Sequence, residues 1–151
     1  LPAGNVLNSG TGFLNPVEET TLTIPSTATK VITVGAYDAR FDQAAAFSGR
    51  GYTRATNQVK PDLVAPGVEI MSCAPGGGYQ VRTGTSMATP FVTGSAALLM
   101  QWGIVNGNDA YLYGEKMKAY LIRGARRLPG FTAYPNPVLG WGALCTANSI
   151  P

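Results

Sequence analysis

The chain has 151 residues and a net charge of +3, from 11 Lys and Arg against 8 Asp and Glu. This length suffices for one domain with a sizeable core. At 45% hydrophobic and 13% charged residues, the chain is apolar for a free-standing domain. The only basic cluster, Arg123, Arg126 and Arg127, suits a helix C-terminus, so we expect no nucleic-acid partner. No apolar stretch reaches the roughly 18 residues of a membrane span, so we expect no membrane partner.

The first half of the chain predicts short strands separated by loops. Residues 30–36 are apolar on both faces, which is typical of a strand in a parallel sheet. The predicted strands are residues 1–3, 30–36, 62–65 and 69–73, with an irregular segment at 41–50. The glycine-rich residues 75–83 predict a hairpin-like loop. They lack the Gly-Lys-Ser/Thr ending of a phosphate-binding loop, so we reject that function.

The second half predicts two helices and a last strand. Residues 86–102 are apolar nearly all round, which indicates a buried helix. Residues 109–126 predict an amphipathic helix with Asn108 or Asp109 as its cap. The apolar face of this helix consists of Leu112, Met117, Tyr120 and Leu121. A proline-rich loop and a strand are expected at residues 128–137 and 138–145. With no repeat and no clear linker, the pattern favours one α/β domain.

Ser86 stands at the start of the apolar helix, after Gly84 and Thr85. Gly84 permits backbone conformations that a Cβ would block, and Thr85 is a suitable N-cap. A helix N-terminus offers free N–H groups and a positive dipole end, which favour an oxyanion beside a first-turn serine. A serine nucleophile needs an adjacent base, most often histidine, and this chain contains none. An ordinary capped core helix would also explain Gly-Thr-Ser taken alone.

The longer run from Gly84 to Gly94 resembles the serine-region signature of subtilisin-like serine proteases, the subtilases. Phe91 departs from the family, which usually has there a histidine that is not its catalytic base. Further segments resemble family segments in order and spacing: Pro2-Ala3-Gly4-Asn5, residues 24–36, 47–51, 60–67 and 140–144. The resemblance implies a parallel-sheet, α/β subtilisin-like fold. Residues 1–151 would form only the C-terminal part of its single catalytic domain.

The resemblance also implies peptide-bond hydrolysis through an acyl-enzyme, on a peptide or protein substrate. Ser86 would be the nucleophile, and Asn5 and the Ser86 N–H would donate to the oxyanion. Leu1, Pro2, Ala3 and Gly4 would bind substrate along one wall of the specificity pocket. The bond before Pro25 would be cis and border that pocket. In subtilases the catalytic Asp and His precede this asparagine, so the N-terminal part of the same domain is an implied partner.

The cysteines and acidic residues define no further site in the sequence. Cys73 and Cys145 could pair, but two cysteines make no disulfide framework. No cluster has zinc spacing. Family members often bind calcium, but no compact oxygen-rich loop is visible, so we predict no metal and no cofactor. The resemblance favours a secreted or cell-envelope protein. A Ser–Lys dyad is disfavoured because no lysine lies near Ser86 in the sequence.

Two alternatives to a working protease remain open. The chain could belong to a pseudoprotease, a subtilase-like scaffold used for binding or regulation. Intact Ser86 and Asn5 count against this, since a scaffold has no chemical reason to keep both. It could instead be a subunit processed just before Leu1 and still associated with its N-terminal partner. Because it has no histidine, we expect the isolated chain to be inactive. We also expect an exposed strand edge at Leu1 to favour self-association.

Overall fold

The computed structural model describes residue 12 and residues 14–151 of the chain, so the predicted strand at residues 1–3 lies outside the described part. The strands in that part are β1 (Val34–Asp38), β2 (Gln43–Ala44), β3 (Gly51–Tyr52), β4 (Val59–Lys60), β5 (Leu63–Pro66), β6 (Ile70–Cys73) and β7 (Tyr79–Arg82). The helices are α1 (Thr85–Met100), continued by the π-helical turn η2 (Gln101–Val105), then α2 (Gly114–Arg123) and α3 (Thr146–Ser149).

The central sheet has the strand order β2-β1-β5. β1 and β5 are parallel, with Val34 opposite Leu63, which confirms the parallel pairing. β2 adds an antiparallel edge inside the segment predicted to be irregular. Leu63 and Ala65 face the larger core, whereas Val64 faces the smaller one, so β5 is buried on both faces as its unbroken apolar run indicates.

β1 begins at Val34, later than the predicted start of that strand. The reason is that main-chain groups just before it are bonded to side chains. The Thr33 N–H donates to a carboxylate oxygen of Asp62 at 2.7 Å, and the Val31 carbonyl accepts from Lys60 at 3.0 Å. These side chains replace the neighbouring strand as hydrogen-bond partners of the segment.

The remaining strands form two antiparallel pairs. β3 pairs with β4, and β6 pairs with β7 from Ile70–Arg82 to Cys73–Tyr79. The β6–β7 pair confirms the predicted hairpin. Its turn contains Gly76, Gly77 and Gly78, all at positive φ, which explains the glycine run.

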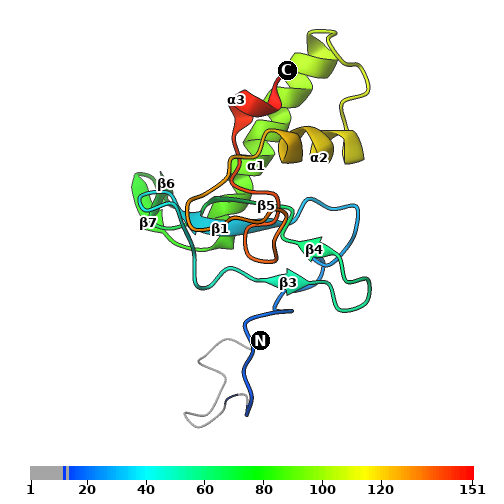
Figure 1. The fold of residues 1–151 in the computed structure, drawn as a ribbon. Helices are drawn as coiled ribbons and strands as arrows, with labels where there is room; N and C mark the ends of the chain where they lie inside the picture. The colour runs from blue at the N-terminus through cyan, green and yellow to red at the C-terminus, as the bar shows by residue number, and fades with distance from the viewer. Residues whose placement is uncertain (1–11, 13) are drawn as a thin grey trace.

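The helix α1 crosses the central sheet and extends past it, and α2 and α3 lie beside its far end (Figure 1). Its buried residues, Ala88, Val92, Ser95 and Leu99, follow helical spacing and form one face. The prediction of a helix buried all round is wrong within the described structure. Leu98 is 53% exposed, and Phe91 and Met100 are exposed too.

The apolar helical run is longer than expected because η2 prolongs α1. By length and composition, Thr85–Val105 could cross a membrane, although the core helix of a globular protein can meet the same criterion. The helix packs against β1 and β5, as a core helix does.

The helix α2 starts at Gly114, later than the predicted 109, and its N-cap is Tyr113 rather than Asn108 or Asp109. Asp109 instead closes the preceding turn, accepting hydrogen bonds from the Tyr111 N–H and from Lys116. The predicted apolar face holds, since Met117 and Leu121 are buried in the helix and Leu112 just before it.

The predicted last strand, 138–145, is wrong. Ala143 makes only isolated bridges, to Val64 and to Arg126. Gly140 and Gly142 have φ of 58° and 127°, which interrupt an extended conformation. Residues 128–137 are irregular as predicted. Cys73 is exposed, Cys145 is half-buried, and both are free thiols.

Candidate active site

Ser86 is the second residue of α1 and its side chain is exposed. The N-cap is Gly84 rather than Thr85, and no side-chain hydrogen bond caps the helix. The Gly84 N–H donates to the Gly67 carbonyl at 2.8 Å, which ties the serine loop to the turn after β5. A Cβ on Gly67 would meet Gly84 O at 2.9 Å, so this close approach needs glycine.

Ser86 opens onto a cavity of about 270 Å³. Pro25, Ser26 and Thr33 line this cavity together with Ser86. An adjoining cavity of about 390 Å³ shares Ser26 and Thr33. The Ile24–Pro25 peptide is cis, which confirms that prediction. The structure therefore brings Pro25 to the cavity of the helix-start serine.

The other predicted site residues lie outside the described structure. These are Asn5, the expected oxyanion donor, and Leu1, Pro2, Ala3 and Gly4, the expected substrate-binding wall. Their placement beside Ser86 stays a prediction.

The aspartates in the described structure all form ion pairs with Lys or Arg side chains. Asp62 lies within 2.7 Å of both Lys60 and Lys118. The other aspartates are paired in the same way: Asp38 with Arg40, Asp42 with Arg126 and Asp109 with Lys116. Hydrogen bonds from these partners hold the pKa of each of the three carboxyls below its usual value. An ion-paired carboxylate of lowered pKa is a weak proton acceptor at neutral pH, so none is a suitable base for Ser86.

Among the described residues, no group of three or more His, Cys, Asp or Glu side chains is placed to hold a metal ion. That statement concerns only these residues, and the expected absence of calcium stays a prediction.

Sequence reasoning did not assign a role to Ser26, Thr33 or Lys118. Ser26 and Thr33 belong to the segment that resembles a family strand, but only the fold places them at the cavity. Lys118 is far from Ser86 in the sequence and carries no motif, so no sequence signal could have indicated it.

The chain belongs to the subtilase family, whose sequence model matches residues 2–142. The fold, the helix-start serine and its cavity agree with this class of serine protease. Serine protease AprX of Bacillus subtilis (strain 168) is 34% identical over 99% of this chain. An intracellular serine protease of Paenibacillus polymyxa is 46% identical over 51% of the chain.

A solved structure, that of the Clostridium perfringens CspB protease, superposes with a TM-score of 0.90 and 49% identity over 95% of this chain. The chain spans 36% of the length of AprX and 30% of the CspB chain. The relatives therefore contain much that this chain does not.

Proposed function

We propose that this chain is the serine-bearing, C-terminal part of a subtilase catalytic domain, residues 1–151, that hydrolyses peptide bonds in peptide or protein substrates. The observation that carries the proposal is the position of Ser86. It lies in the first turn of α1, whose N-terminus has no side-chain cap, and it lines a cavity together with cis-Pro25. The helix N-terminus supplies N–H donors and a positive dipole end where negative charge would develop.

In the proposed reaction, Ser86 Oγ attacks the substrate carbonyl and gives its proton to a histidine. The Asn5 amide and the Ser86 N–H donate to the oxyanion, and a water later hydrolyses the acyl-enzyme. Leu1, Pro2, Ala3 and Gly4 form a wall of the substrate site. No metal or cofactor takes part.

The proposal requires the Asp and His of the triad to come from the N-terminal part of the same domain. One observation in support of such a partner is chemical: the chain contains no histidine, and the described aspartates all form ion pairs. A second observation is that the apolar side chains of Phe91, Leu98 and Met100 on α1 are exposed, and such a partner would cover them. The isolated chain is accordingly inactive.

We further propose that the complete protein is secreted or bound to the cell envelope. Family membership does not decide this, since one relative is named an intracellular protease.

The test is covalent labelling of the full-length protein with a fluorophosphonate, a reagent for activated serines, followed by peptide mapping. We expect the label on Ser86. Replacing Ser86→Ala should abolish labelling and lower kcat by about 10⁶, the loss seen for the nucleophile of subtilisin. Replacing Asn5→Ala should keep the label but lower kcat by about 10²–10³, as for the oxyanion asparagine of subtilisin.

The matched control is Ser72→Ala, an exposed serine in β6, which should leave both measurements unchanged. A full-length protein that takes no label at Ser86 and shows no peptide hydrolysis would contradict the proposal. In that case a non-catalytic scaffold would be the better account.

A further inference from the structure

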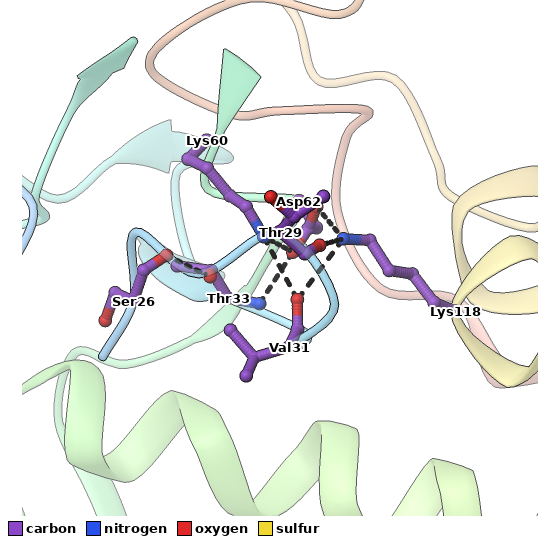
Figure 2. Close-up of polar contacts among 7 residues, drawn as sticks. All are labelled: Ser26, Thr29, Val31, Thr33, Lys60, Asp62 and Lys118. Atoms are coloured by element: carbon purple, nitrogen blue, oxygen red, sulfur yellow. Dashed lines mark hydrogen bonds and ion pairs between the residues drawn. The ribbon is translucent and has the colours of Figure 1, made fainter. Parts of the chain in front are cut away.

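A buried ion-pair network lies behind the Ser86 cavity. Lys60 and Asp62 are almost fully buried, with side chains 2% and 5% exposed, and their charged atoms are 2.7 Å apart. Lys118 reaches in from α2 to the other oxygen of the same carboxylate, also at 2.7 Å (Figure 2). The network thus joins the helix α2 to the start of β5, a strand of the central sheet.

Lys118 holds main chain as well as the carboxylate. An ammonium group has three N–H donors. Besides Asp62, the Lys118 Nζ donates to the carbonyls of Thr29 at 3.0 Å and Val31 at 3.2 Å. The Lys60 Nζ donates to the same Val31 carbonyl at 3.0 Å. The two lysines therefore fix the residues that precede β1.

From Asp62 the contacts continue to the cavity wall. Asp62 Oδ2 accepts the Thr33 N–H at 2.7 Å, and the Thr33 carbonyl accepts the Asp62 N–H at 2.9 Å. The Thr33 hydroxyl then donates to the Ser26 carbonyl at 2.6 Å (Figure 2). Ser26, Val31 and Thr33 line the cavity onto which Ser86 opens.

The charges of the three side chains show which of them can be replaced without destabilising the protein strongly. Burial lowers the pKa of Lys60, so this ammonium relies on Asp62 to stay charged. Losing Asp62 would leave the buried Lys60 ammonium without its carboxylate partner, which is strongly destabilising. Losing Lys118, which is 16% exposed, leaves the Lys60–Asp62 pair neutral as a unit.

We propose that Lys118 is a positioning residue of the active site. It fixes the carbonyls of Thr29 and Val31 and, through Asp62 and Thr33, the wall of the cavity that receives the substrate side chain before the cleaved bond. This inference rests on the proposed protease function. Lys118 does not touch the reacting atoms, so it acts on substrate binding rather than on the chemical step.

The test compares full-length wild type with Lys118→Met, which keeps an unbranched side chain one heavy atom shorter and removes the charge. For peptides with a large side chain before the cleaved bond, we expect KM to rise about tenfold with kcat within about twofold. Peptides with glycine at that position should show no change in KM, because they leave the cavity empty. The rate of fluorophosphonate labelling should also be unchanged.

The matched control is Lys116→Met, on the same helix. Lys116 pairs with Asp109, away from the cavity, and its side chain is 45% exposed. It should leave KM unchanged for both kinds of peptide. The variant Lys118→Arg keeps a cation that can reach Asp62, so it should restore most of the lost affinity.

The outcomes separate the two proposals. If wild type takes the label at Ser86 but Lys118→Met raises KM no more than Lys116→Met does, the positioning role is overturned and the proposed function stands. An equal rise in KM for glycine peptides would also overturn it, since that result indicates a general structural defect. If wild type takes no label, the proposed function fails and the positioning role fails with it.

Discussion

At Gly140 the main chain passes so close to the carbonyl oxygens of Pro61 and Asp62 that no side chain fits. The Trp141 N–H donates to the Asp62 carbonyl at 2.9 Å, so this approach helps to hold the segment that carries the buried carboxylate. The φ of Gly140 is 58°, a region that residues with a Cβ rarely adopt. Two separate effects therefore require glycine here.

Replacing Gly140→Ala should lower the free energy of unfolding by about 3 kcal/mol, from backbone strain and overpacking together. The control is Gly130→Ala, where φ is also positive but nothing lies within 4 Å of the added Cβ. That variant should lose only about 1 kcal/mol, the strain alone. Urea unfolding of the full-length protein measures both, and equal losses would show that the close approach contributes nothing.

At the scale of elements, one ion pair joins the loop before β2 to the chain after α2. The Arg126 guanidinium donates to both oxygens of Asp42, at 3.1 and 2.8 Å. These hydrogen bonds lower the pKa of Asp42 from its usual 3.8. A carboxyl whose pKa is lower in the folded state stabilises the fold above its unfolded pKa. It loses that contribution as pH falls through the folded value.

Replacing Asp42→Asn should therefore lower Tm at pH 7, and the deficit should shrink as pH falls below about 4. Asparagine suits this position because Asp42 has a φ of 53°, which Asn tolerates well. Thermal unfolding of wild type and variant between pH 7 and pH 3 measures the effect. Arg126→Met should show the same pH dependence, and adding it to Asp42→Asn should cost little more. A deficit that stays constant with pH would refute the linkage.

At the scale of the whole molecule, α1 and its continuation η2 carry large apolar side chains that are uncovered within the described structure. Leu98 of α1 is 53% exposed, and Val105 at the end of η2 is 76% exposed. Large exposed apolar patches mark interaction sites or cause aggregation. Under the proposed function, these side chains would pack against the N-terminal part of the domain.

Residues 1–151 produced alone should therefore self-associate, giving species larger than 15.8 kDa that grow with concentration. Leu98→Gln should shift the distribution toward monomer. Tyr111→Gln should not, because Tyr111, although 72% exposed, lies outside α1 and η2. Sedimentation velocity at several concentrations measures this. A monomer at every concentration would contradict the prediction.

The sequence correctly predicted those elements that depend on neighbouring residues in the chain rather than on distant contacts. The glycine run predicted the β6–β7 hairpin, because positive φ is a property of the residue itself. The apolar spacing of Met117 and Leu121 predicted the buried face of α2. The boundaries were wrong where a side chain supplied a hydrogen bond, as Asp109 does before α2 and Asp62 does before β1. The predicted last strand was wrong because Gly140 and Gly142, at positive φ, interrupt the extended chain. The segment therefore makes only isolated bridges.

The sequence by itself determined the class of the protein and the residue proposed to react. The run around Ser86 and the absence of histidine follow from residue identity and order alone. Only the tertiary structure decided which residues surround that serine. It places Ser26 and Thr33 in the wall of the cavity beside Ser86, and it pairs Lys118 of α2 with Asp62. Such contacts join residues far apart in the chain, and side-chain packing selects them rather than local pattern.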